Sequence, residues 1–190
     1  MKVTIHQPEH FPYMGFFQKM EQSDLFVILD DVQFTKGNFQ NRNKFVNKNN
    51  IEEWFGVQLE SSASKMNINQ IKTASGNWRT KVIKKIKQNF GYDFTDIYEN
   101  ELLADINLKS IEWARKKLNI NTPMIKSSDL NINSSSTQRL VDICKKVKAT
   151  EYISGQGGKN YLDLKLFDNI NVTYHTPQLD NYYSCIYNIK

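Results

Sequence analysis

The sequence has 190 residues and a mass of 22.2 kDa, which suits one domain with a hydrophobic core of its own. With 25 Lys and Arg against 20 Asp and Glu, the formal charge of +5 favours anionic partners only weakly. No apolar stretch approaches the roughly 18 residues of a membrane span, and residues 1–20 lack the pattern of a signal peptide. The two cysteines form no CxxC pair, which argues against a disulfide framework. We expect a cytoplasmic protein without a membrane span.

The first thirty residues predict the opening of a parallel α/β unit. A β-branched run at residues 3–5 is followed by Pro8 and Pro12, which exclude a regular helix or strand between them. Residues 14–22 place apolar side chains at helical spacing, and the apolar run at residues 25–29 is typical of a strand buried on both faces. Strand, loop, helix and buried strand in this order indicate a βαβ crossover.

The rest of the chain continues the alternation of helices and strands. Residues 32–50 are polar and rich in Asn, which predicts a long loop. The patterns that follow predict a strand at 54–59, helices at 78–90, 107–118 and 137–148, a strand at 152–154, a short helix at 159–167 and a strand at 172–174. We therefore predict a single α/β domain over residues 1–190, with a mostly parallel, Rossmann-like sheet flanked by helices and a long loop after the second strand.

Four unusual segments follow predicted strands, and together they are the strongest indication of a ligand site. They cover residues 6–12, 30–43, 155–161 and 175–177. In a parallel sheet, ligands bind beyond the carboxyl ends of the strands, where loops and helix N-termini converge. The sequence thus predicts an enzyme or a small-molecule binder, with these segments meeting at one edge around an anionic ligand.

The first two segments supply the candidate catalytic groups. A histidine at the end of a strand, here His6, acts as a general base, hydrogen-bonds a phosphate, or only satisfies backbone groups of a tight loop. Gln7 and His10 are candidate substrate-binding residues beside it, although the flanking prolines argue against His6 and His10 as a metal pair. Of the adjacent Asp30 and Asp31, one faces the site as a base or hydroxyl acceptor, or else caps a turn.

The other segments supply candidate binding groups. Cations, amides and phenylalanines are mixed over residues 34–43, a combination that suits a sugar or a phosphate; the candidates there are Lys36, Asn41, Arg42 and Asn43. The glycine-rich turn could cradle an anion with its amides or only form a tight strand-to-helix connection; its candidates are Gly155, Gly157, Gly158, Lys159 and Tyr161. It matches neither GxGxxG nor the P-loop, and the sequence carries no metal signature.

Several of these motifs, taken in order, resemble the WbqC-like protein family. The resemblance runs from Lys2 to about Pro177 and rests on Ile5-His6-Gln7-Pro8, Pro12-Tyr13-Met14-Gly15-Phe16-Phe17, Phe26-Val27-Ile28-Leu29-Asp30-Asp31-Val32-Gln33-Phe34, Asn41-Arg42-Asn43 and Tyr152-Ile153-Ser154-Gly155-Gln156-Gly157-Gly158. It implies a role in the biosynthesis of bacterial O-antigen lipopolysaccharide or another surface polysaccharide. Residues 180–190 depart from the family's usual tail, which leaves the role of this tail open.

The resemblance favours a transferase that moves an acyl or aminoacyl group to the amine of a nucleotide-linked amino sugar. His6, Asp30 or Asp31 would be its base, and an acyl donor or a nucleotide its co-reactant. One alternative is a nucleotidyltransferase-like enzyme that binds ATP or CTP, although the histidine spacing departs from HxGH. Another is a non-catalytic module that binds sugar nucleotides. Nucleic-acid binding ranks last, because the basic residues form no stripe with interleaved aromatics. The donor, the acceptor and the oligomeric state stay open.

Overall fold

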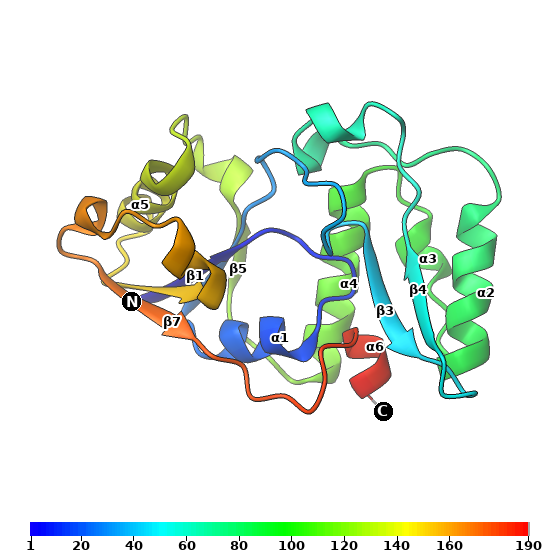
Figure 1. Ribbon diagram of the computed structural model, residues 1–190. Coiled ribbons are helices and arrows are strands. Elements are labelled where there is room, and N and C mark those ends of the chain that lie inside the picture. The colour runs from blue at the N-terminus through cyan, green and yellow to red at the C-terminus, as the bar shows by residue number, and fades with distance from the viewer. Residues whose placement is uncertain (190) are drawn as a thin grey trace. The chain divides into compact units, whose positions relative to one another are not determined.

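A computed structural model describes residues 1–189 (Figure 1). The contacts between residues divide the chain into two compact units. Unit 1 comprises Met1–Gln7, Gly15–Leu29 and Ile120–Asp180, and unit 2 comprises Pro8–Met14, Asp30–Asn119 and the residues from Asn181 onward. The chain passes between the units several times, which is why no single linker in the sequence marks a boundary.

Unit 1 contains a sheet of five parallel strands in the order β5-β2-β1-β6-β7. The strands are β1 (Lys2–His6), β2 (Leu25–Ile28), β5 (Met124–Lys126), β6 (Glu151–Gly155) and β7 (Asn171–His175). Helices α1 (Met14–Glu21) and α5 (Ser136–Lys146) flank this sheet (Figure 1). The predicted α/β class with a parallel sheet and flanking helices is therefore confirmed.

Alternation along the strands separates the two faces of the sheet. Val3, Ile5 and Val27 belong to one hydrophobic cluster with the apolar stripe of α5, which includes Leu140, Ile143 and Cys144. The opposite face meets α1, where the ring of Phe16 lies 5.0 Å from that of His6 and 4.9 Å from that of Phe26. Because successive residues of a strand point to opposite faces, His6 shares the α1 face with Phe26.

Unit 2 is built from a β-hairpin and helices. Strands β3 (Arg42–Val46) and β4 (Glu52–Gly56) pair antiparallel, and the helices are α2 (Trp78–Phe90), α3 (Thr95–Tyr98), α4 (Leu103–Lys117) and α6 (Cys185–Asn188). The inner face of the hairpin is aromatic: the ring of Phe45 lies 4.9 Å from that of Phe90 on α2 and 5.6 Å from that of Phe55. This packing leaves the other face of the hairpin toward solvent.

The structure differs from the sequence prediction at several elements, including the short helices α3 and α6, which were not predicted. Strand β3 lies inside the predicted loop at 32–50, because its inward residues, Asn43 and Phe45, include a buried amide that hides the apolar alternation. Strand β5 is only three residues long and was not predicted. In place of a helix at 159–167, two short 3₁₀ turns occupy Gln156–Asn160 and Leu164–Phe167. Among residues 1–189, no helix has the length and apolar character that crossing a bilayer requires.

Gly56 closes the hairpin by a close backbone approach. A Cβ at this position would come within 2.3 Å of the Asn41 carbonyl oxygen and 2.8 Å of Arg42 Cα, and backbone atoms cannot swing aside. We predict that Gly56→Ala lowers the free energy of unfolding by about 1–3 kcal/mol, as overpacking does, measured by urea denaturation. Gly157→Ala is the control, because nothing lies within 4 Å of its Cβ position. Equal stability of the two variants would contradict this packing.

Candidate functional site

The candidate residues fall into both units. Unit 1 contains His6, Gln7 and the glycine-rich turn with Lys159 and Tyr161, whereas unit 2 contains His10, Asp30, Asp31 and the polar loop with Lys36, Asn41, Arg42 and Asn43. In unit 1, predicted residues from distant parts of the sequence come together at the carboxyl edge of the parallel sheet. That edge is the candidate functional site.

Three neighbouring strands end at this edge with a histidine, a glycine and a histidine. Gly155 at the end of β6 pairs in register with His175 at the end of β7. On the other side of β6, continuing the Val3–Tyr152 register places His6 beside Gly155. Because adjacent strands lie about 4.8 Å apart, the two histidines flank a gap roughly two strand spacings wide, which a glycine leaves open. Strand alternation turns all three residues to the α1 face.

Helix α1 places a buried cation opposite this gap. Lys19 is only 3% exposed, and a Cβ added to Gly155 would lie 3.8 Å from the Nζ atom of Lys19. Gln18, one residue earlier, fixes the segment after β7: its Nε2 donates to the Gln178 carbonyl at 2.8 Å, and its Oε1 accepts from the Gln178 N–H at 3.1 Å. The helix therefore positions both the cation and the chain that leaves the last strand.

His175 has one ring nitrogen committed and one buried without a partner. Its Nδ1–H donates to Gln22 Oε1 at 3.0 Å, and the residue is 7% exposed. Its Nε2 is buried and has no hydrogen bond of normal geometry within residues 1–189, although a backbone group of Gly15 lies close enough to the ring to raise its pKa. A buried polar atom without a partner is costly, and it marks a place where a ligand or water supplies the missing bond. Gln156 secures the backbone here by donating to the His175 carbonyl at 3.0 Å.

Both histidines of this edge are held neutral. Burial and, to a smaller extent, the charge of Lys19 lower the pKa of His6 to about 3, although the bond of 2.9 Å between its Nδ1 and the Gln7 carbonyl opposes the shift. Burial and the charge of Lys19 also lower the pKa of His175, and a backbone hydrogen bond with Gly15 opposes this shift. Neutral imidazoles accept protons and hydrogen bonds, and an anion beside Lys19 would raise both pKa values by cancelling its charge.

The glycines of the glycine-rich turn differ in their surroundings: one is tightly packed and another is open to solvent. Gly158 is buried, and a Cβ there would come within 2.1 Å of Ser154 Oγ, so its glycine is required by close approach. Gly157 is exposed, with nothing near its Cβ position. Lys159 Nζ lies 5.2 Å from the ring centroid of Tyr174, and Tyr161 is 64% exposed. The turn thus presents an exposed cation and an exposed phenol.

In unit 2, His10 is a core residue. It is fully buried among the rings of Phe11, Phe55 and Tyr98, and its Nε2 lies 3.0 Å from the Tyr98 hydroxyl. Asn43 is also buried, and its Nδ2 donates to the carbonyls of His10 and Phe11 at 3.3 and 2.8 Å. These contacts hold the loop between the two prolines, so both residues have a structural explanation.

Unit 2 contains several cavities; two of them share Leu59, Glu60 and Ser61 in their walls, and one of these two is lined by predicted residues. The smaller, of about 270 Å³, is lined by Phe34, Lys36, Asn41, Leu59, Glu60, Ser61, Ala63 and Ser64. Its mixture of ammonium, amide, carboxylate and hydroxyl groups suits a polyhydroxylated ligand. Asp30 is 2% exposed, its carbonyl accepts from the Asn69 N–H at 2.9 Å, and Asp31 is half-buried. Among residues 1–189, no cluster of three His, Cys, Asp or Glu side chains is arranged to hold a metal ion.

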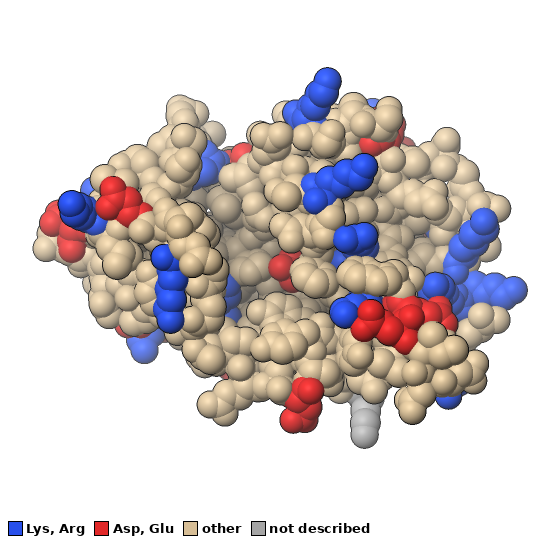
Figure 2. All heavy atoms as spheres, viewed as in Figure 1, with Lys and Arg blue, Asp and Glu red and all other residues tan. Residues whose placement is uncertain are grey.

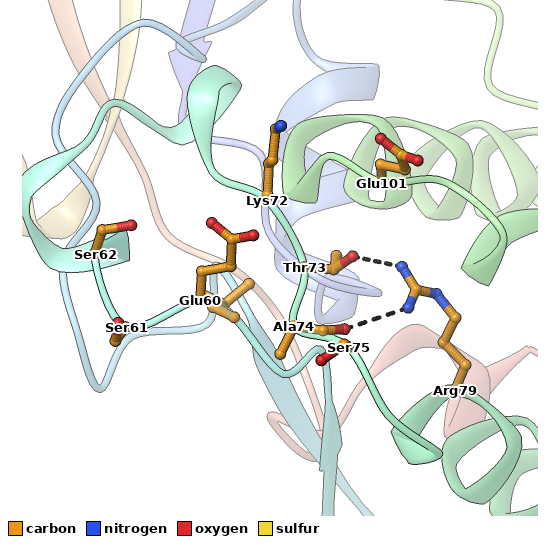
Figure 3. A pocket seen from close by; sticks show the side chains of 10 residues that line it. Glu60, Ser61, Ser62, Lys72, Thr73, Ala74, Ser75, Arg79 and Glu101 are labelled. Carbon is orange, nitrogen blue, oxygen red and sulfur yellow. Dashed lines mark hydrogen bonds between the residues drawn. The ribbon is translucent and has the colours of Figure 1, made fainter.

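The larger cavity, of about 650 Å³, is the one in Figure 3. Arg79 on its wall is a structural cation: Nε donates to the Tyr98 carbonyl at 2.7 Å, and its terminal nitrogens donate to Thr73 Oγ1 and to the carbonyls of Ala74 and Asn100. Glu60, Lys72 and Glu101 are the other charged residues of the wall. Because the N–H groups of the Arg79 guanidinium already donate to carbonyls and a hydroxyl, few donors remain in this cavity for an incoming anion.

The comparisons with known proteins assign a family. The model of the WbqC-like protein family matches residues 7–188. The chain belongs to the WbqC-like protein family. An uncharacterized protein of Mycobacterium tuberculosis, Rv1507c, is 26% identical over 194 residues, covering 95% of this chain and 84% of the relative. No solved structure matches the chain significantly.

The important residues that the sequence did not single out in this WbqC-like chain are Lys19 and His175. Lys19 stands in an ordinary amphipathic helix, where a lysine indicates a solvated face. His175 belongs to a segment that was recognised after the last strand, but its sequence neighbours carry no motif. Only the positions of these residues could have indicated a role. Lys19 precedes a buried methionine, and His175 ends a strand at the same edge as His6.

The burial of His10 makes the stability of this WbqC-like fold depend on pH. Burial lowers the pKa of His10 to about 3, so between pH 6.5 and 3 the unfolded chain takes up a proton that the folded chain does not. Acidification therefore lowers the free energy of unfolding, and His10 contributes about 1.4 kcal/mol per pH unit within this window. We predict that His10→Gln reduces the slope by about that amount in urea denaturation at pH 6.0, 5.0 and 4.0.

Tyr98→Phe is the control for this prediction. It removes the hydroxyl next to His10 Nε2 but leaves the imidazole buried and neutral. It should lower stability and keep the slope of the parent protein. An unchanged slope in His10→Gln would contradict the lowered pKa of His10 in the folded protein.

Proposed function

We propose that this chain is a transferase of bacterial surface-polysaccharide biosynthesis, which moves an acyl or aminoacyl group to the amine of a nucleotide-linked amino sugar. The observation that supports it best is the buried, unpartnered Nε2 of His175 beside the buried Lys19 at the carboxyl edge of the sheet. The class of reaction rests on the resemblance described from the sequence, and the parallel sheet supports the position of the site.

The chemistry assigned to this edge is general-base catalysis with electrostatic assistance. The sugar amine attacks the acyl carbon, a C–N bond forms, and the bond from that carbon to the donor's leaving group breaks. The attacking nitrogen gives its proton to His175 Nε2, which returns it to the leaving group. His6 is the alternative base, because its Nδ1 is also committed to a carbonyl.

The charge of Lys19 makes the pKa of this base depend on whether the substrate is bound. In the free protein its charge and burial disfavour an imidazolium at either histidine. A phosphate bound opposite Gly155 would cancel that charge, and the pKa of the base would then rise toward neutrality. Binding of the nucleotide-linked substrate thus precedes and enables proton transfer. The predicted carboxylates Asp30 and Asp31 have no role in this scheme.

Two neighbouring residues of strand β7 provide the test of catalysis and its control. We expect His175→Gln to lower product formation by about 10²-fold or more, the usual effect of losing a general base, in an assay that combines nucleotide amino sugars with acyl donors and reads product mass. Tyr174→Phe changes the preceding residue, which points to the opposite face of the sheet, and should stay active. Full activity in both His175→Gln and His6→Gln would rule out these residues as the base.

The binding test narrows the gap between the histidines. Gly155 has a φ of −73°, and an added Cβ makes only an ordinary contact with Lys19 Nζ, so Gly155→Ala should fold. We expect it to reduce the thermal stabilisation by UDP-linked amino sugars, whereas Gly157→Ala retains it. Binding without turnover across a panel of donors would favour the sugar-nucleotide binding module instead. Pyrophosphate release from ATP or CTP would favour the nucleotidyltransferase.

A further inference from the structure

The outer face of the β3–β4 hairpin in unit 2 carries an aromatic residue between two cations. Asn43 and Phe45 point into the core, so Arg42 and Lys44 point outward, and Trp54 is the register partner of Lys44. Trp54 is 43% exposed. Figure 2 shows basic side chains spaced over β3, with acidic side chains gathered beside one end of the strand. Large exposed aromatic rings are uncommon away from binding surfaces, which makes this face a candidate site.

The guanidinium of Arg42 lies over the ring of Trp54 and keeps part of its hydrogen-bonding capacity. Its Cζ is 4.6 Å from the ring centroid of Trp54, and its Nη2 donates to the Gly37 carbonyl at 2.9 Å. Within residues 1–189 it makes no ion pair, and its Nε and Nη1 groups donate to no protein atom. Lys44, by contrast, is paired with Glu52 at 2.9 Å. Arg42 is therefore the uncompensated charge, with donors in the geometry that phosphate accepts.

Phe39 is the second exposed aromatic residue of this face and packs near Trp54. Its ring is 6.3 Å from that of Trp54, centroid to centroid, with only 18° between the planes, and the residue is 39% exposed. It belongs to the loop in which Gly37, with a φ of +91°, makes the turn that brings its carbonyl to Arg42. Two nearly parallel aromatic rings beside a stacked guanidinium form a platform, which we call the Trp54 platform and define as Phe39, Arg42 and Trp54.

We infer that the Trp54 platform binds a nucleotide, with the base stacked on the aromatic rings and a phosphate held by Arg42. A nucleobase offers the π face that aromatic side chains stack on, and an adjacent phosphate matches the free guanidinium donors. A sugar phosphate lacks the flat ring, and a nucleoside lacks the charge, so each would use only half of the platform. The inference does not depend on the proposed transfer reaction, because it concerns binding alone.

Binding is measured by calorimetry and by tryptophan fluorescence. Trp78 is 3% exposed and Trp113 is half-buried, so quenching by a stacked base should come mainly from Trp54. UMP and AMP should bind and quench, while ribose 5-phosphate and uridine should bind at least about tenfold more weakly, as expected when stacking or the charge is lost. Ribose 5-phosphate that binds as tightly as UMP would overturn the stacking, and no binding of either nucleotide would overturn the inference.

Three variants locate the ligand. Trp54→Leu should weaken UMP binding by about tenfold or more in calorimetry, because stacking on an aromatic ring is lost. Arg42→Lys keeps the charge but not the flat fork, and should also weaken it. Lys48→Ala removes an exposed charge from the turn of the same hairpin and should bind as the parent does. Equal affinity of Trp54→Leu and the parent protein for UMP would place the ligand elsewhere.

A free nucleotide and a nucleic-acid strand share this chemistry, and a second titration separates them. An oligothymidylate of eight nucleotides that binds much more tightly than TMP, with an affinity that falls steeply with salt, would identify a single strand as the ligand. Equal affinity per site for TMP and the oligonucleotide would identify the free nucleotide. Both results support the platform, whereas failure of both ligands to bind would overturn it. Transfer activity plays no part in this readout.

Discussion

Successive side chains of a strand point to opposite faces, and this alternation decides which groups of unit 1 meet helix α1. Val3 and Ile5 are committed to the hydrophobic cluster with α5, so His6 must point to the other face. The same alternation along β7 turns His175 to that face, and Gly155 between them adds no side chain. A shift of one residue in either strand would bury the imidazole against α5 and remove it from the edge. The position of the candidate site thus follows from the register of the sheet.

Placing Lys19 opposite this gap imposes an electrostatic cost that packing alone does not require. Burial of an ammonium is unfavourable, and the two imidazoles near Lys19 have lowered pKa values, first because they are themselves buried and second because of its charge. A methionine would fill similar space without this penalty, as Met20 does in the next position of the helix. A fold that keeps a buried imidazole nitrogen without a hydrogen bond of normal geometry beside a glycine gap has given up stability where a ligand would recover it, as functional sites do.

Several regular elements of both units could be predicted because their patterns are local. The apolar run of β2 and the stripes of α2 and α5 each coincide with an element of the structure within about two residues. Strand β3 could not be predicted, since its inward Asn43 reads as polar until its amide is seen to bond the carbonyls of His10 and Phe11. The roles of Lys19, and of His175 within the recognised segment 175–177, could not be assigned for a related reason. Each role depends on contacts with residues more than a hundred positions away or on another strand, and no periodicity in the sequence records such contacts.

The fate of the two histidines in the first motif shows how loop geometry assigns function. Phe11 has a φ of +42°, a conformation that disfavours any residue with a Cβ, so the segment between Pro8 and Pro12 needs external support. Amides provide it: Asn107 Nδ2 donates to the Pro8 and Gln40 carbonyls at 2.9 and 2.7 Å. A loop fixed in this way buries His10 as one of its packing residues, while His6, still in strand β1, follows the alternation of the sheet. Two histidines four residues apart therefore serve different units, and only the one governed by the sheet is available for chemistry.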